Sequence, residues 1–207
     1  MPLIVSEALA ALAGYLLGSV SFAIVVSRLM RLPDPRSYGS KNPGTTNVLR
    51  TGNKLAAVLT LAGDALKGFV AVVLALIYLP DSAPYVGVAA FLGHLYPVYH
   101  RFQGGKGVAT AAGVLFGFDA WLGLATLATF VVIAAFFRYV SLASLVAAVF
   151  AVFFSWFLKL GDATTVAIAV MSLLLVWRHR ENIRRLVAGT ESKLGEKKAT
   201  PPGPSAA

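Results

Sequence analysis

The stretch that decides the fold class is residues 55–79, which read LAAVLTLAGDALKGFVAVVLALIYL. Asp64 and Lys67 are its only charged residues, and they stand one helical turn apart. A helix of roughly 20 apolar residues is long enough to cross the ~30 Å hydrocarbon core of a bilayer. We therefore interpret residues 55–79 as a membrane-spanning helix.

The rest of the chain has the same character. Hydrophobic residues make up 57% of the 207 residues and charged residues 13%, against about 25% charged residues in an ordinary globular protein. A soluble protein of this size cannot bury so much apolar surface. Further apolar runs extend over Ala8–Leu29, Tyr85–Tyr99, Val108–Phe118, Trp121–Phe137, Val140–Leu158 and Ala163–Trp177. The sequence predicts an all-α polytopic membrane protein with about seven transmembrane helices.

Three of these runs have unusual features. Ala8–Leu29 has no basic leader, because Arg28 is the first Lys or Arg of the chain, and we interpret it as a retained helix rather than a cleaved signal peptide. Tyr85–Tyr99 and Val108–Phe118 are short, so they are either compact spans or a re-entrant pair. Seven crossings or five both put the two chain ends on opposite sides of the membrane.

The basic residues predict the orientation. The chain has 18 Lys and Arg against 9 Asp and Glu, a net charge of +9. Alternating crossings put every basic residue except Lys159 on one side, which the positive-inside rule makes cytoplasmic. We expect the N-terminus outside, the C-terminus inside, one transmembrane domain over residues 1–191, and a disordered cytoplasmic tail over residues 192–207.

The first polar segment on the cytoplasmic side is residues 39–50, GSKNPGTTNVLR. Glycines, short polar side chains and two cations can surround phosphate oxygens with N–H and O–H donors. The alternative is an ordinary juxtamembrane loop whose basic residues serve topology. We favour the anion site, since a topological loop has no need of Thr45, Thr46 and Asn47 beside Pro43 and Gly44.

The second polar segment is residues 102–110, FQGGKGVAT, which open the run beginning at Val108. Three glycines and Lys106 at a helix N-terminus make a seat for an anion. Gly107 follows the lysine where a nucleotide-binding P-loop has Ser or Thr, so ATP or GTP binding is unsupported. The alternative is a flexible hairpin between two short helices.

The third polar segment, residues 178–191, reads RHRENIRRLVAGTE. If the preceding run continues as a helix, His179 and Asn182 share one face. A stop-transfer cluster explains the arginines but not these two residues.

Four polar residues lie inside or beside the apolar runs. Asp64 and Lys67 are either a structural ion pair or a substrate contact. We interpret His94 as a hydrogen-bonded packing residue. Ser141 marks a turn near Arg138, where it anchors the turn or lines the site.

Taken together, these motifs resemble the bacterial acyl-phosphate:glycerol-3-phosphate acyltransferases. The resemblance covers Ala8–Glu191, with three motifs in the same order. It implies seven helical spans, an active site on the cytoplasmic side of the inner membrane, an acyl phosphate donor, glycerol-3-phosphate as acceptor, and lysophosphatidic acid and phosphate as products. It also implies that no cofactor takes part and that neither acyl-CoA nor acyl carrier protein is used directly.

The resemblance further implies roles for individual residues. Ser40, Asn47, Arg50 and Lys106 would bind substrate phosphates, His179 and Asn182 would complete the active site, and Glu191 would hold structure. We assign as catalytic residues Ser40, Lys106, His179 and Asn182, and as substrate-binding residues Asn42, Thr45, Thr46, Asn47, Arg50, Gly104, Gly105, Gly107 and Ser141.

Several chemistries are excluded or left open. The chain has no cysteine and three histidines, which leaves no thiolate nucleophile and little material for a metal centre; nucleic acid is not an expected partner. For acyl transfer, the base is a substrate phosphate oxygen or His179. A small transporter for a phosphorylated metabolite and a structural membrane scaffold are the competing functions.

Overall fold

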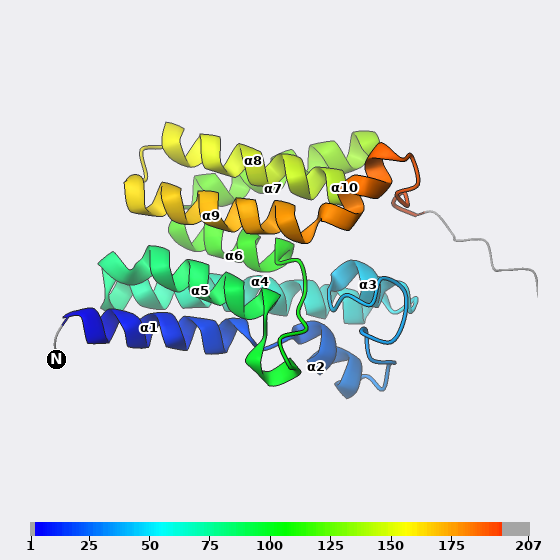
Figure 1. Ribbon diagram of the computed structural model, residues 1–207, viewed down its shortest axis with the longest axis horizontal. Coiled ribbons are helices and arrows are strands. Elements are labelled where there is room, and N and C mark those ends of the chain that lie inside the picture. The colour runs from blue at the N-terminus through cyan, green and yellow to red at the C-terminus, as the bar shows by residue number, and fades with distance from the viewer. Residues whose placement is uncertain (1–2, 196–207) are drawn as a thin grey trace, which may run out of the picture.

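The computed structural model describes residues 3–195, and in that range every regular element is helical (Figure 1). The α-helices are α1 (Leu3–Gly18), α2 (Phe22–Leu29), α3 (Thr45–Leu49), α4 (Lys54–Tyr78), α5 (Ala83–Leu95), α6 (Val108–Phe118), α7 (Ala120–Phe137), α8 (Val140–Phe157), α9 (Asp162–Arg178) and α10 (Arg180–Val187). Short 3₁₀ turns occupy Pro80–Ser82 and Val98–His100.

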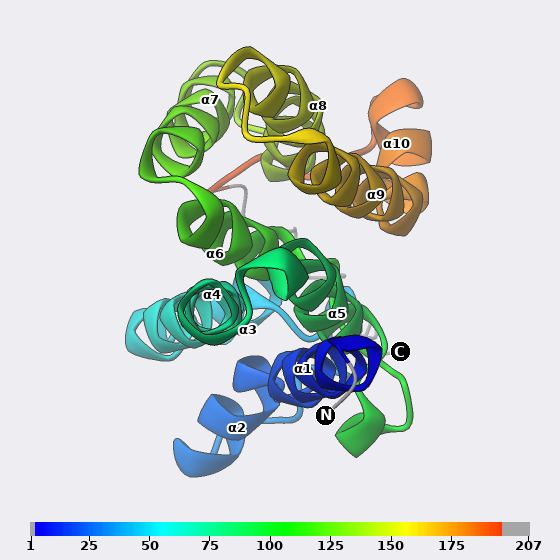
Figure 2. The same ribbon diagram turned by 90° about the vertical axis from the view of Figure 1, so that its left-hand side faces the viewer.

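The longer helices lie side by side, and the short ones gather at one end of the bundle. Helix α1 packs along α5, α4 along α6, and α8 packs between α7 and α9 (Figures 1 and 2). Helices α2, α3 and α10 and the connection between α5 and α6 lie together, away from the start of α1. We call this the loop end; it contains all three polar segments.

Among residues 3–195, four segments are long and apolar enough to cross a membrane: Ile4–Leu29, Lys54–Tyr78, Ala120–Phe137 and Val140–Phe157. Their outward faces carry exposed apolar side chains such as Phe136 and Trp156. The all-helical prediction is confirmed for residues 3–195. The count of seven spans stays a prediction, because α5 has 13 residues and α6 has 11.

The first apolar run is not one continuous helix, and this corrects the sequence prediction. Helix α1 ends at Gly18, and α2 begins at Phe22, displaced from the α1 axis (Figure 2). The Lys67 ammonium donates to the Val20 carbonyl (2.7 Å), and the Phe22 N–H donates to Asp64 (3.4 Å). A backbone group left unpaired in hydrocarbon costs several kcal/mol, so these side chains stabilise the break.

Asp64 and Lys67 form an ion pair of 2.8 Å, with both side chains almost fully buried. Their position against the break between α1 and α2 explains why two charges lie inside the bundle. Of the two interpretations that the sequence left open, the structural ion pair is the one observed.

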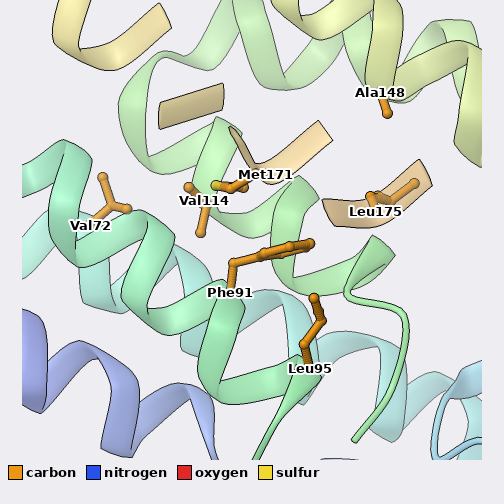
Figure 3. Close-up of a cluster of buried hydrophobic side chains, with 7 residues drawn as sticks. All are labelled: Val72, Phe91, Leu95, Val114, Ala148, Met171 and Leu175. Carbon is orange, nitrogen blue, oxygen red and sulfur yellow. The ribbon is translucent and has the colours of Figure 1, made fainter. Parts of the chain in front are cut away.

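A cluster of buried apolar side chains lies under the loop end. Phe91 and Leu95 of α5 meet Leu175 of α9 there (Figure 3). Leu175 is one turn before His179, and the rings and methyl groups of Phe91 and Leu95 lie against Gly107. The core therefore fixes both the second and third polar segments. Its remaining members are Val72, Val114, Ala148 and Met171.

The predicted tail is placed only at its beginning. The Leu194 N–H donates to the Arg138 carbonyl (2.6 Å), and Arg138 Nη2 donates to the Leu194 carbonyl (2.8 Å). These bonds hold residues 192–195 against the turn between α7 and α8. Residues 196–207 of the expected tail lie outside the described residues.

Candidate functional site

A chain of hydrogen bonds links the second polar segment to the third. Lys106 Nζ donates to Asn182 Oδ1. Asn182 Nδ2 donates to Glu191 Oε1 (2.6 Å), and the Ser141 hydroxyl donates to the same oxygen (2.7 Å). Arg185 Nε meets the other oxygen, Glu191 Oε2, at 2.6 Å. Three predicted site residues, Lys106, Asn182 and Ser141, therefore belong to one network.

Glu191 is the centre of that network. Burial opposes its ionisation, but hydrogen bonds from Asn182, Ser141 and Arg185 outweigh burial and lower its pKa. The carboxylate thus stays ionised and orients the Asn182 amide, so that Asn182 Oδ1 accepts from Lys106.

His179 stands at a break in the helix. Helix α9 ends at Arg178 and α10 begins at Arg180 in a new direction (Figure 1), so the straight continuation considered from the sequence is corrected. Both His179 and Asn182 are nevertheless buried. The His179 Nδ1–H donates to the Leu175 carbonyl (2.8 Å), which leaves the lone pair of the neutral ring on Nε2. Burial lowers the pKa of His179 to about 4.

The three glycines of the second segment are required by close packing. A Cβ on Gly105 would overlap the His94 ring, one on Gly104 would overlap the His94 carbonyl, and one on Gly107 would overlap Phe91. Gly107 also has φ of +85°, which favours glycine. The Gly105 N–H donates to the His94 carbonyl (3.1 Å), so in this conformation that donor is not directed at a ligand.

Arg178 holds the same loop by its carbonyls. Its Nη2 atom donates to the Gly104 carbonyl (2.8 Å) and the Gly105 carbonyl (3.0 Å), and its Nε donates to the Gly105 carbonyl (3.2 Å). The guanidinium also lies over the Tyr96 ring, 5.6 Å from its centroid. Arg178, which precedes His179 at the end of α9, thus ties the loop that carries Lys106 to the third polar segment.

In the first segment, Asn47 organises the loop. Its Nδ2 donates to the Pro35 carbonyl (2.6 Å), and its Oδ1 accepts from the Ser40 N–H (3.1 Å) and Arg50 Nη1 (3.1 Å). Asn47 lies in α3, a short helix where the sequence indicated a loop. Its amide is therefore engaged within the protein, whereas other predicted side chains remain partly or fully exposed at the loop end: Ser40, Asn42, Thr45, Thr46 and Arg50.

The first and second segments meet. The Pro43 carbonyl lies 2.8 Å from where a Cβ on Gly105 would be.

Burial lowers the pKa of Lys106 to about 8; the nearby cations Arg185, Arg178 and Arg50 lower it too, and Glu191 opposes them. A buried cation among other cations is stabilised by a bound anion, so this arrangement suits a phosphate.

The sequence reasoning missed two residues of this site. Arg178 and Arg185 read as part of a stop-transfer cluster, and nothing in the sequence singles them out from Arg180 and Arg184. A position next to His179 was the available signal for Arg178. Among residues 3–195, no group of three or more His, Cys, Asp or Glu side chains is close enough to hold a metal ion.

Comparison with known proteins assigns the family. The sequence profile of the family described as "Glycerol-3-phosphate acyltransferase" matches residues 8–189. A glycerol-3-phosphate acyltransferase of Cupriavidus necator is 63% identical over 194 residues, covering 91% of this chain and 96% of the relative. The chain belongs to the glycerol-3-phosphate acyltransferase family. A second member, from Burkholderia ambifaria, is 65% identical over 194 residues and covers 92% of each chain.

Solved structures agree with this assignment. The crystal structure of PlsY (YgiH), described as an integral membrane glycerol 3-phosphate acyltransferase in its glycerol 3-phosphate form, has a TM-score of 0.88 and 38% identity, and covers 92% of this chain and 96% of that one. Its lysophosphatidic acid form has a TM-score of 0.86 and 37% identity at the same coverage. This glycerol-3-phosphate acyltransferase is therefore an integral membrane enzyme of phospholipid synthesis.

Proposed function

We propose that this acyltransferase uses an acyl phosphate as donor and glycerol-3-phosphate as acceptor, and that it releases lysophosphatidic acid and inorganic phosphate. The observation that carries the proposal is the contact of Lys106 with Asn182. This contact joins the glycine-rich second segment and the arginine-rich third segment into one cationic site at the end of an apolar bundle. A phosphorylated donor and a phosphorylated acceptor explain why several cations converge there.

The reaction follows from the chemistry of the donor. An acyl phosphate is a mixed anhydride, so its phosphate leaves without a strong acid. The glycerol hydroxyl oxygen forms a bond to the carbonyl carbon, and the bond between that carbon and the phosphate oxygen breaks. Lys106 and Arg50 stabilise the charge that develops on the carbonyl oxygen and the leaving phosphate, an effect commonly worth ~3–4 kcal/mol per donor.

The hydroxyl proton goes to a phosphate oxygen of the substrate. His179 orients a substrate oxygen through Nε2, since its Nδ1–H is committed to the Leu175 carbonyl. The alternative is that His179 Nε2 takes the proton as general base. Both versions need the neutral ring, and a pKa of about 4 keeps it neutral at physiological pH.

The other residues have binding and supporting roles in this proposal. Asn182 aims Lys106, and Ser141 holds Glu191 in place. Asn47 shapes the first segment. The side chains that contact substrate from that segment are Ser40, Asn42, Thr45, Thr46 and Arg50.

The proposed setting is the bacterial inner membrane, with seven spans and the loop end facing the cytoplasm. All basic residues except Lys159 lie on the predicted cytoplasmic side of the chain, as the positive-inside rule requires. The acyl chain stays in the bilayer while the polar pocket aligns the hydroxyl with the donor.

A purified-enzyme assay tests the proposal. Protein in liposomes receives radiolabelled glycerol-3-phosphate with palmitoyl phosphate or palmitoyl-CoA. We expect labelled lysophosphatidic acid and an equal amount of phosphate with palmitoyl phosphate, and no product with the CoA ester. Product from palmitoyl-CoA alone would overturn the donor assignment. Uptake of label without lipid product would instead indicate a transporter. Asp64 and Lys67, intramembrane charges that a transporter could use, are engaged at the helix break.

A further inference from the structure

His94 lies between the buried ion pair and the glycine loop, and the reaction described above does not use it. It is buried near the end of α5. Its Nδ1 atom is 3.0 Å from Lys67 Nζ and 3.1 Å from the Thr110 hydroxyl. The other side of the ring faces Gly105.

The contact with Lys67 fixes the protonation of the ring. A lysine ammonium has three N–H donors and no acceptor. Those of Lys67 reach Asp64 Oδ1 (2.8 Å), the Val20 carbonyl (2.7 Å) and His94 Nδ1 (3.0 Å). Nδ1 must therefore accept, and the neutral ring carries its hydrogen on Nε2, the atom next to Gly105.

His94 also holds the glycine loop through its backbone. Its carbonyl accepts the Gly105 N–H (3.1 Å). The space in which a Cβ of Gly105 would stand is filled by His94 Nε2. Gly105 precedes Lys106, so the position of the His94 ring limits where the Lys106 backbone can lie.

We propose that His94 is a positioning residue for glycerol-3-phosphate binding. Lys67 and Thr110 hold the ring, and the ring holds the Gly104–Gly105 backbone so that Lys106 reaches Asn182. The proposal rests on the acyltransferase function and adds a residue that acts through Lys106 rather than on the substrate. It also gives the ion pair a second task, because the side chains that stabilise the break between α1 and α2 also orient the loop.

Two glycines that lie side by side provide the test. A Cβ on Gly105 meets the His94 side chain, whereas a Cβ on Gly104 meets backbone and Pro97. Shortening the side chain with His94→Asn keeps an acceptor for Lys67 and removes the atom that Gly105→Ala would strike. The Gly104→Ala clash is unaffected by that change, which makes Gly104 the matched control.

The measurement is the dissociation constant for glycerol-3-phosphate, by titration calorimetry, in wild type, in each single variant and in both double variants. We expect Gly105→Ala to weaken binding about 10-fold in wild type and less than about threefold in the His94→Asn background, because contacting residues are coupled. Relief is incomplete since the Pro43 carbonyl remains 2.8 Å from the new Cβ. Gly104→Ala should cost the same factor in both backgrounds.

If Gly105→Ala raises the dissociation constant by the same factor in both backgrounds, the positioning role of His94 is overturned. A substitution that only destabilises the fold lowers the yield and the melting temperature but does not make the effect of Gly105→Ala on binding depend on His94. If His94→Asn does not purify, the same cycle with His94→Ser decides the question. The binding measurement needs no donor, so it is separate from the donor assay. Wild-type protein that binds glycerol-3-phosphate but makes no product from palmitoyl phosphate contradicts the proposed donor and leaves the cycle valid.

Discussion

Lys106 donates a hydrogen bond to the side-chain oxygen of Asn182, a residue 76 positions further along the chain. One partner belongs to the loop before α6 and the other to α10, and Glu191 holds Asn182 in turn. Because a lysine beside a neutral amide keeps its charge unpaired, the pair leaves a cation available to an incoming anion. The candidate site is therefore a shared property of segments that the sequence presents separately.

Removing the Lys106 charge should disable the site without unfolding the protein. We expect Lys106→Ala to lower kcat/KM for glycerol-3-phosphate by about 10²–10³-fold, the usual effect of losing one donor that stabilises developing charge. Lys54→Ala is the matched control, since Lys54 is an exposed lysine at the start of α4, and it should change kcat/KM less than twofold. Steady-state kinetics measures kcat/KM for both variants. If Lys106→Ala and Lys54→Ala lower it equally, Lys106 is not part of the site.

The pH profile should report the charge on Lys106. Its pKa is about 8, lowered mainly by burial, so the ammonium is lost as the pH rises through 8 and kcat/KM should fall above that value. His179 is neutral throughout this range, and substrate phosphate titrates near pH 6, so neither produces the alkaline limb. In Lys106→Arg the alkaline limb should move beyond pH 10. A limb that stays near 8 in that variant would assign it to another group.

The positions of the helices were largely predictable from the sequence, and the departures have a common cause, which is contact between residues far apart in the chain. The helix predicted over residues 55–79 matches α4 almost residue for residue, because a long apolar run by itself indicates a helix in an apolar environment. The break at residues 19–21 was invisible, since Ser19, Val20 and Ser21 do not interrupt hydropathy. Its partners, Asp64 and Lys67, lie more than forty residues away, as the separations of 42 and 47 positions show.

The site followed the same rule. Lys106, Asn182 and Ser141 were predicted, and the structure joins them through Glu191. The interpretation of Gly105 as part of an anion seat was incomplete, because its N–H donates to the His94 carbonyl and the His94 ring fills the space that a Cβ would need. These are tertiary contacts, and they cannot be predicted from the spacing of residues within one segment.

Glu191 should act by orientation rather than by proton transfer. Glu191→Gln keeps the shape but loses the charge that Arg185 and Asn182 face, so we expect a lower melting temperature and kcat/KM reduced about 10-fold, as for loss of a hydrogen bond to a charged group. Glu181→Gln, which changes an exposed carboxylate on α10, the helix that carries Asn182 and Arg185, is the control and should leave both unchanged. Thermal melting and kinetics check this; a larger loss from Glu181→Gln would contradict it.

The two candidate bases differ in what His179→Gln should do. Because we assign the proton to substrate phosphate, we expect kcat to fall only about 10-fold, through lost orientation of the substrate. A general base contributes about 10²–10⁴-fold, so a loss of 10³-fold or more in single-turnover acyl transfer would favour the histidine base.

The central claim is that the separate polar segments lie together on the cytoplasmic side of the membrane. The chain has no cysteine, so single cysteines can be placed cleanly at Gln103 and Thr190, which are exposed at the loop end, and at Lys159, which is exposed between α8 and α9. A membrane-impermeant maleimide applied to spheroplasts should label Lys159→Cys at once, and Gln103→Cys and Thr190→Cys only after permeabilisation. Labelling of either Gln103→Cys or Thr190→Cys in sealed spheroplasts would contradict the shared cytoplasmic site.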